Sequence, residues 1–274
     1  MTETAAAAGL AGIKHIVAVA SGKGGVGKST TSVNLALAMA ALGKSVGLLD
    51  ADIYGPSQAL MLGLGEEVKP RVIDQKYMKP VRAHGIASMS MGYLATANTP
   101  MVWRGPMAGG ALIQMLEQTL WGELDILVVD MPPGTGDIQL TLAQKAAVSG
   151  AVIVTTPQDI ALLDARKGIE MFRKVNIPVL GIVENMAMHT CSNCGHVEHI
   201  FGEGGGLRVA GEYEVPLLGS LPLDRRIREE TDSGVPTVAK EPDGALAGEY
   251  RAVAAKIVAA LEGLEGDEPE IVFE

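Results

Sequence analysis

The sequence predicts an α/β fold, with a mostly parallel sheet and helices on both of its faces. Short runs rich in Val, Ile and Leu alternate with helical stretches along the chain, which is typical of parallel strands joined by crossover helices. Hydrophobic residues make up 47% of the 274 residues but aromatic residues only 4%, so the core must consist mainly of aliphatic side chains. Aliphatic strands that are buried on both faces are the usual content of a parallel sheet.

The strands are expected where a short aliphatic run ends at a polar or glycine-bearing loop. In chain order they are His15–Ala20, Ser45–Leu49, Asp125–Val129, Ala151–Thr155, Val179–Glu184 and Leu217–Leu221. The expected helices are Ser29–Leu42, Met107–Trp121, Gln139–Ala147, Leu162–Val175 and Gly244–Leu264. The least regular stretch, Leu62–Met101, includes Gly85–Ser90 and is expected to hold a short extra strand or hairpin. Ligands of such sheets bind at the carboxyl ends of the strands.

No linker or internal repeat divides the chain, so residues 13–264 are interpreted as a single domain. Residues 1–12 are small and Ala-rich and are expected to form a flexible tail, and the acidic residues 265–274 a disordered one. The net charge of −10 argues against bulk nucleic-acid binding. No apolar run could span a bilayer, and two cysteines do not make a disulfide framework. We therefore expect a soluble cytoplasmic protein that binds neither nucleic acid nor membrane.

The most informative motif is Gly22-Lys23-Gly24-Gly25-Val26-Gly27-Lys28-Ser29, which matches the phosphate-binding loop (P-loop) of nucleoside triphosphatases. A predicted strand precedes it and a predicted helix follows, as the motif requires. Its glycines allow backbone N–H groups to face phosphates at the positive end of a helix. Lys28 is expected to reach the β- and γ-phosphates, and the Ser29 hydroxyl to ligate Mg²⁺. Thr30 completes the nucleotide-binding run.

Lys23 is a second lysine that an ordinary P-loop does not need. With it, the motif resembles the deviant P-loop (deviant Walker A motif) of the MinD/ParA/NifH-type ATPases. In that class the first lysine crosses a dimer interface and touches the partner's nucleotide, so the resemblance implies an ATP-dependent homodimer in which Lys23 is catalytic. A cation placed at the γ-phosphate stabilises the charge that develops during transfer.

Aspartates end two of the predicted strands. Asp50 and Asp52 lie two residues apart, so their side chains point the same way while the strand lasts. One of them can lie beside the Mg²⁺ shell while the other orients the attacking water. The resemblance to the deviant-loop ATPases assigns the water to Asp52 and the more structural role to Asp50. Asp130 follows an aliphatic run, which is typical of the carboxylate that holds Mg²⁺ through water, and Pro132–Gly136 is interpreted as a γ-phosphate-sensing loop.

Asn185 follows the predicted strand Val179–Glu184. Its amide offers both a donor and an acceptor, which suits the edge of an adenine ring. In the related ATPases an asparagine at this place reads the base and the region of Pro222 lies against the ring, so ATP is favoured over GTP. The alternative is an asparagine that caps the following turn.

Cys191 and Cys194 form a Cys-x-x-Cys pair whose thiolates can bind one metal centre. Iron–sulfur clusters and structural zinc usually require four ligands. A symmetric dimer could supply a second pair and bridge a cluster on its two-fold axis. Alternatively, His196 and His199, together with His189, could complete a zinc site within one chain. A redox pair, or two reduced thiols without a metal, are further interpretations of the same pattern.

The order of motifs along the chain resembles the Mrp/ApbC (Mrp/Nbp-type) family of iron–sulfur cluster carrier ATPases. The motifs that carry this resemblance are the P-loop, Asp50–Ser57, Trp103–Met107, Asp130–Asp137, Glu184–Met186, the Cys-x-x-Cys pair and Phe201–Gly206. Together they cover about Lys14 to Val238. Many members carry proline after the first cysteine, where this chain has Ser192, so the turn between the thiols is expected to be looser.

The resemblance implies a homodimer that holds a labile 4Fe–4S cluster on Cys191 and Cys194 and transfers it to apo-proteins. ATP and Mg²⁺ would be held by Lys28, Ser29 and the loop glycines, with Lys23 acting across the dimer and Asp52 supporting a slow hydrolysis.

A different hypothesis is a spatial-organisation ATPase of the MinD or ParA kind. Such a protein would need a membrane-binding basic helix or a basic DNA-binding surface, which the acidic C-terminus and the net charge disfavour. An ATPase with a structural zinc site is a third hypothesis, which metal content would distinguish. A reductase like the nitrogenase iron protein is a fourth, but its cluster ligands lie farther apart in the sequence than Cys191 and Cys194.

Overall fold

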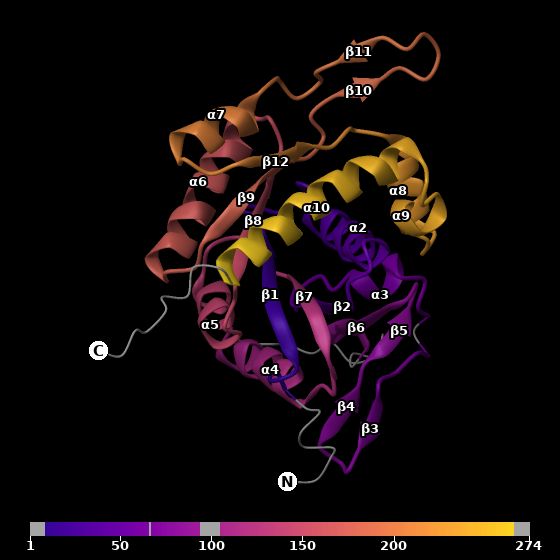
Figure 1. Ribbon diagram of the computed structural model, residues 1–274, viewed down its shortest axis with the longest axis vertical. Coiled ribbons are helices and arrows are strands. Elements are labelled where there is room, and N and C mark those ends of the chain that lie inside the picture. Colours follow the sequence, from indigo (N-terminus) through magenta and orange to yellow (C-terminus); the bar gives the residue numbers. More distant parts are fainter. Residues whose placement is uncertain (1–8, 66, 94–104, 266–274) are drawn as a thin grey trace, which may run out of the picture.

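The structure, a computed structural model, describes residues 9–65, 67–93 and 105–265. Its centre is an eight-stranded sheet in the order β12-β9-β8-β1-β7-β2-β6-β5, in which neighbouring strands are parallel except for β5 and β6 (Figure 1). The predicted strands all occur in this sheet. They are β1 (Ile13–Ala20), β2 (Val46–Asp50), β7 (Leu124–Asp130), β8 (Gly150–Thr155), β9 (Val179–Glu184) and β12 (Leu217–Ser220).

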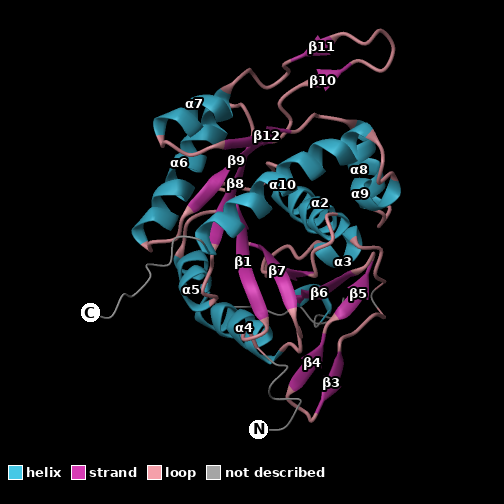
Figure 2. Cartoon of the chain, in the orientation of Figure 1, coloured by secondary structure: helices cyan, strands magenta, loops and turns pink. Residues whose placement is uncertain are grey.

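Helices cover both faces of the sheet (Figure 2), as the sequence predicts. Alternate residues of β1 face opposite ways: Ile16 and Ala18 pack into one core, while Val17 and Val19 pack into the other. The first core is closed by α4 (Gly105–Gln118), α5 (Asp137–Lys145), α6 (Asp159–Lys174) and α7 (Gly205–Glu212). The second is closed by α2 (Lys28–Ala41), α8 (Arg225–Asp232), α9 (Thr237–Lys240) and α10 (Ala245–Glu265).

The irregular stretch after residue 62 extends the sheet, as expected. β6 (Ile86–Ser90) pairs in parallel with β2, and β5 (Val81–Ala83) pairs with β6 through a turn that contains His84 and Gly85, both with positive φ. A separate hairpin of β3 (Arg71–Ile73) and β4 (Tyr77–Lys79) lies away from the main sheet. A 3₁₀ turn, η1 (Met91–Tyr93), follows β6.

Several short elements were not predicted. They are α3 (Gln58–Met61), the helices α7, α8 and α9, and a hairpin of β10 (His189–Thr190) and β11 (Val197–Glu198). This hairpin carries the Cys-x-x-Cys pair and projects beyond the body of the molecule at the top of Figure 1.

The N-terminal segment differs in part from the expected tail. The Gly9 N–H donates to the Thr119 carbonyl at 3.2 Å, and the Gly12 carbonyl accepts from the Leu124 N–H at 2.9 Å, so residues 9–12 are hydrogen-bonded to the domain. Residues 1–8 of the expected N-terminal tail and residues 266–274 of the expected C-terminal tail lie outside the described residues, as do Trp103 and Arg104. No helix in the described ranges combines the length and apolarity needed to cross a membrane.

The register of the central strands places polar residues side by side at the carboxyl edge. Asp50 of β2 lies opposite Asp130 of β7 on one side and Ser90 of β6 on the other. The P-loop leaves the same edge from the end of β1, which neighbours β7. The sheet therefore brings the P-loop and the two strand-end aspartates together.

Candidate functional site

The P-loop joins β1 to α2 in an open turn. Gly25 and Gly27 have φ angles of 82° and 80°, in the left-handed region that favours glycine. A Cβ atom added at Gly24 or Gly25 would meet no heavy atom within 4 Å, whereas one added at Gly27 would lie 2.2 Å from Asn185 Nδ2. The loop is therefore open on the side where a phosphate could approach, and closed where it packs against Asn185.

A hollow of about 220 Å³ lies over this loop. It brings together the sequence-predicted residues Lys23, Lys28, Ser29, Thr30 and Asp52. The remaining lining comes from the loop glycines and from Ser21, Ser57, Met61 and Pro133. Pro133 belongs to the predicted γ-phosphate-sensing loop, whose Gly134 N–H donates to the Ser21 carbonyl at 2.9 Å. That loop is thus hydrogen-bonded to the start of the P-loop.

Lys28 and Asp130 form a buried ion pair beneath the hollow. Lys28 Nζ lies 2.5 Å from Asp130 Oδ1 and 3.2 Å from Ser29 Oγ. The Ser32 hydroxyl donates to the same carboxylate oxygen at 2.8 Å. The ion pair therefore links the P-loop helix to the end of β7.

Asp50 is fully buried and accepts hydrogen bonds from several donors. Its Oδ2 accepts from the backbone N–H groups of Ser57 and Gln58, both at 3.0 Å, and from the Ser90 hydroxyl at 3.0 Å. Burial, together with the neighbouring Asp130 carboxylate, raises the pKa of Asp50 to about 7. Asp50 thus fixes the loop that carries Asp52, while Asp52 itself faces the hollow.

Gln58 is a site residue that sequence reasoning missed. It is 1% exposed, and its Nε2 donates to Asp130 Oδ2 at 2.9 Å and to the Ser29 carbonyl at 3.0 Å. Its Oε1 is buried and has no hydrogen-bond partner among the described residues. Because it sits in a short helix after a Pro-Ser turn, no motif distinguished it.

A second hollow, of about 260 Å³, adjoins the first at Gly27 and Thr30. Asn185 and Pro222, the predicted adenine-contacting residues, both line it. Asn185 Nδ2 donates to the Val26 carbonyl at 2.9 Å, which leaves its Oδ1 and one N–H for other partners. Pro222 is brought alongside because the Ala187 N–H donates to the Leu221 carbonyl at 2.9 Å.

The two cysteines lie together on the β10–β11 hairpin. Cys191 is partly exposed and Cys194 is exposed, and neither is in a disulfide. The Gly195 N–H donates to the Cys191 carbonyl at 2.9 Å and closes a tight turn around the pair. Hydrogen bonds from the backbone N–H groups of Asn193 and Cys194 lower the pKa of the Cys191 thiol, which favours the thiolate that binds metals.

The alternative of a zinc site within one chain is not favoured. His189 Nδ1 lies 2.9 Å from the Leu223 carbonyl and His199 Nδ1 lies 2.9 Å from the Ala187 carbonyl, which leaves Nε2 of each ring as the possible ligand atom. In the part of the chain that the structure describes, no three His, Cys, Asp or Glu side chains gather to hold a metal ion. One chain thus offers two thiol ligands on the hairpin.

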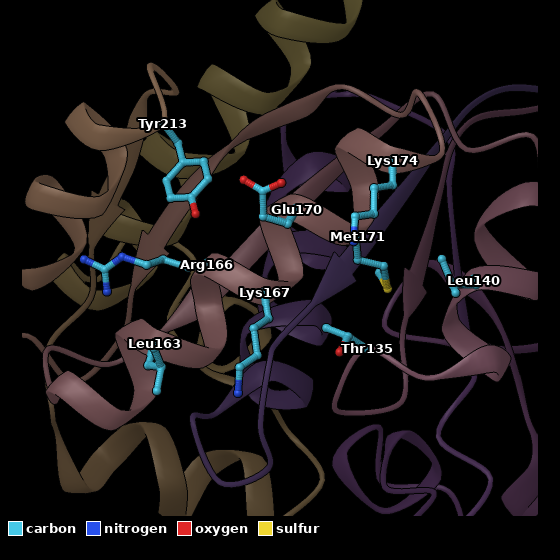
Figure 3. Close-up of a pocket in the computed structure, with 9 residues that line it drawn as sticks. All are labelled: Thr135, Leu140, Leu163, Arg166, Lys167, Glu170, Met171, Lys174 and Tyr213. Atoms are coloured by element: carbon cyan, nitrogen blue, oxygen red, sulfur yellow. The ribbon is translucent and has the colours of Figure 1, made fainter.

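A larger hollow of about 420 Å³ lies along α6, apart from the P-loop. Figure 3 shows Arg166 and Tyr213 on one side of it and Thr135 and Leu140 on the other. Arg166 is paired with Glu212, with 2.8 Å between Nη2 and Oε2. Of its lining residues, Thr135 belongs to the predicted γ-phosphate-sensing loop, and no sequence motif marked the others.

Comparison with known proteins shows to which family the chain is similar. Residues 12–258 match the ParA family described as NUBPL iron-transfer P-loop NTPase. The iron–sulfur cluster carrier protein of Pseudomonas fragi is 65% identical over 246 residues, which are 90% of this chain and 86% of that protein. The mouse iron–sulfur cluster transfer protein NUBPL is 51% identical over 253 residues, 92% of this chain and 79% of that one.

Two solved structures are similar to this chain in fold. A nucleotide-binding protein of Archaeoglobus fulgidus, in complex with ADP, is 41% identical, with a TM-score of 0.73 and coverage of 82% of this chain and 88% of that one. The cell division ATPase MinD of Pyrococcus furiosus, at 24% identity, has the same fold, with a TM-score of 0.68 and coverage of 90% and 99%. The chain therefore belongs to the NUBPL iron-transfer family of P-loop NTPases.

Proposed function

We propose that this protein is an ATP-hydrolysing homodimer that holds a labile 4Fe–4S cluster between its subunits and delivers it to apo-proteins. The observation that carries the proposal is the course of the chain between the two sites. Asn185 contacts the P-loop carbonyl of Val26, and Cys191, six residues further on, is partly exposed on the hairpin. The names of the relatives in Pseudomonas fragi and mouse support an iron–sulfur cluster as the cargo.

The described residues fit Mg²⁺ and a nucleotide. Ser29 and Asp130 offer oxygen ligands of the kind that Mg²⁺ prefers, and the Gln58 Oε1 is a buried oxygen beside them that lacks a donor among the described residues. The metal, when bound, neutralises charge on the phosphates. Lys28 would bind the β- and γ-phosphates, Asp52 would orient the attacking water, and Lys23 would act on the partner's nucleotide. ATP would lie with its base against Asn185 and Pro222.

The cluster would be held by Cys191 and Cys194 of both subunits, because one chain supplies two of the four thiolates that such a cluster usually requires. ATP must then stabilise one dimer geometry over another if it is to change how firmly the cluster is held. The thiols must stay reduced for ligation, which is the condition of the cytoplasm.

Anaerobic reconstitution with iron and sulfide tests the proposal. We expect about four irons per dimer in the wild-type protein, with absorption near 400 nm, and loss of both in Cys191→Ala and Cys194→Ala. ADP affinity should stay unchanged in both variants, because neither cysteine lines the nucleotide hollows. Ser192→Ala, which changes the same turn without removing a thiol, is the matched control. Tightly held zinc with no iron in the wild-type protein would contradict the carrier function.

A further inference from the structure

We propose that Gln58 is a positioning residue of the magnesium site, an inference that rests on the nucleotide binding proposed above. Its amide nitrogen would hold Asp130 and the Ser29 backbone together. Its oxygen would accept a hydrogen bond from a water molecule in the Mg²⁺ shell.

The orientation of the Gln58 amide follows from its neighbours. Both groups within reach of its nitrogen, Asp130 Oδ2 at 2.9 Å and the Ser29 carbonyl at 3.0 Å, are acceptors. The opposite orientation would direct the amide oxygen at a carboxylate and a carbonyl, which is repulsive. The two N–H groups of Gln58 are therefore both used, and Oε1 is the end that requires a donor.

A buried acceptor without a donor is destabilising, and such groups are rare in folded proteins. The neighbouring cation, Lys28, donates to Asp130 Oδ1 and Ser29 Oγ instead. Water bound to Mg²⁺ is a strong donor, and Mg²⁺ in nucleotide sites keeps several such waters. Gln58 Oε1 belongs to the same side chain that contacts Asp130 and Ser29, the two residues proposed to hold the metal.

Gln58 also connects this site to the loop that carries Asp52. Its backbone N–H donates to Asp50 Oδ2 at 3.0 Å, next to the Ser57 N–H. One residue therefore contacts the P-loop, the end of β2 and the end of β7. Outer-shell partners of this kind typically contribute about 10–100-fold to metal affinity.

The test is the Mg²⁺ dependence of ADP affinity, measured by calorimetry in EDTA and in excess Mg²⁺. Gln58→Met keeps the length of the side chain and removes both amide functions. We expect it to lose about tenfold or more of the gain in affinity that Mg²⁺ gives, taken for each protein as the ratio of its own affinities in excess Mg²⁺ and in EDTA. Thr119→Val is the control, since Thr119 is also buried but donates to the Met115 carbonyl, away from the P-loop. It should retain the full Mg²⁺ gain.

A second measurement needs only the wild-type chain. The side-chain amide resonance of Gln58 should shift when Mg²⁺ is added to the ADP complex. An unmoved resonance, or an equal Mg²⁺ gain in wild type and Gln58→Met, would overturn the proposed role of Gln58 and leave the proposed function standing. A wild-type chain with no affinity for ADP would overturn the proposed function as well.

Discussion

Lys28 Nζ and Asp130 Oδ1 lie 2.5 Å apart, with the two side chains only 6% and 0% exposed. The P-loop lysine is thus one half of a buried ion pair across the sheet edge. Removing one partner of such a pair leaves an uncompensated buried charge, which typically costs about 3–5 kcal/mol.

We therefore expect Lys28→Met to lower the free energy of unfolding by about 3–5 kcal/mol, measured by urea denaturation without nucleotide. Adding Asp130→Asn should restore part of that loss, because the unpaired carboxylate is then gone. Both variants should fail to bind ADP, because both lack the P-loop lysine. A double variant no more stable than Lys28→Met would show that the ion pair is not the cause.

Lys23 is expected to act only in the dimer. Lys23→Ala should bind ADP as the wild type does but fail to dimerise with ATP and fail to hydrolyse it, because the charge that it adds at the partner's γ-phosphate is lost. Sedimentation with a slowly hydrolysed ATP analogue measures the first effect. Lys44→Ala is the control, since Lys44 lies beyond the far end of α2 and pairs with Glu262 at 2.8 Å. Equal dimerisation of wild type and Lys23→Ala would refute the crossing role.

Asp52 is expected to affect turnover rather than affinity. Asp52→Asn retains the shape of the side chain, and its Oδ1 can still accept from the Gly55 N–H, which lies at 3.2 Å. The amide cannot accept a proton from the attacking water as a carboxylate can. Steady-state hydrolysis should therefore fall about 10²–10⁴-fold, while the affinity for Mg²⁺·ADP is kept. Hydrolysis at the wild-type rate in this variant would assign the water to another residue.

Asp50 makes stability depend on pH. Its pKa is raised to about 7 in the folded protein, against about 3.9 in an unfolded chain. Between these pH values the folded state binds more protons than the unfolded state. The stabilisation that the Asp50 proton gives the folded state is therefore fully present below about pH 4 and is lost as the pH rises through about 7. Urea denaturation across this range should show a falling free energy of unfolding, and Asp50→Asn should remove that part of the decline. If the free energy of unfolding fell equally with pH in the wild type and in Asp50→Asn, a group other than Asp50 would be responsible for the decline.

The long elements of the fold could be predicted because each has a clear pattern. The strand β8, for example, is a continuous aliphatic run, and α2 directly follows the P-loop. The short helices could not be predicted in this way. α8 is Arg225–Asp232, a charged segment whose single apolar residue is Ile227, so no set of apolar residues marks it as a helix. It forms because Asp224 caps its first turn and Ile227 joins the core.

The sequence predicted which motif residues line the candidate site, but not the contacts that support them. Lys28, Asp52 and Asn185 belong to motifs with fixed spacing. Gln58 was missed because its contacts depend on β2 and β7 being adjacent, which brings Asp50 and Asp130 to the same place. Such strand neighbours cannot be inferred from the local sequence.

The cysteine hairpin is attached to the domain by a short base. Residues 185–188 are held between the P-loop carbonyl of Val26 and the backbone of Leu221 and Leu223, and the chain enters β10 immediately afterwards. This base contacts the P-loop directly, through the hydrogen bond from Asn185 Nδ2 to the Val26 carbonyl. Inserting a few glycines after Met188 would leave the nucleotide hollows and the cysteine pair intact but remove the short connection between these two proposed sites. If the proposed coupling of nucleotide and cluster exists, the stiffness of residues 185–188 determines its strength, and the length of this segment is the property that would change it.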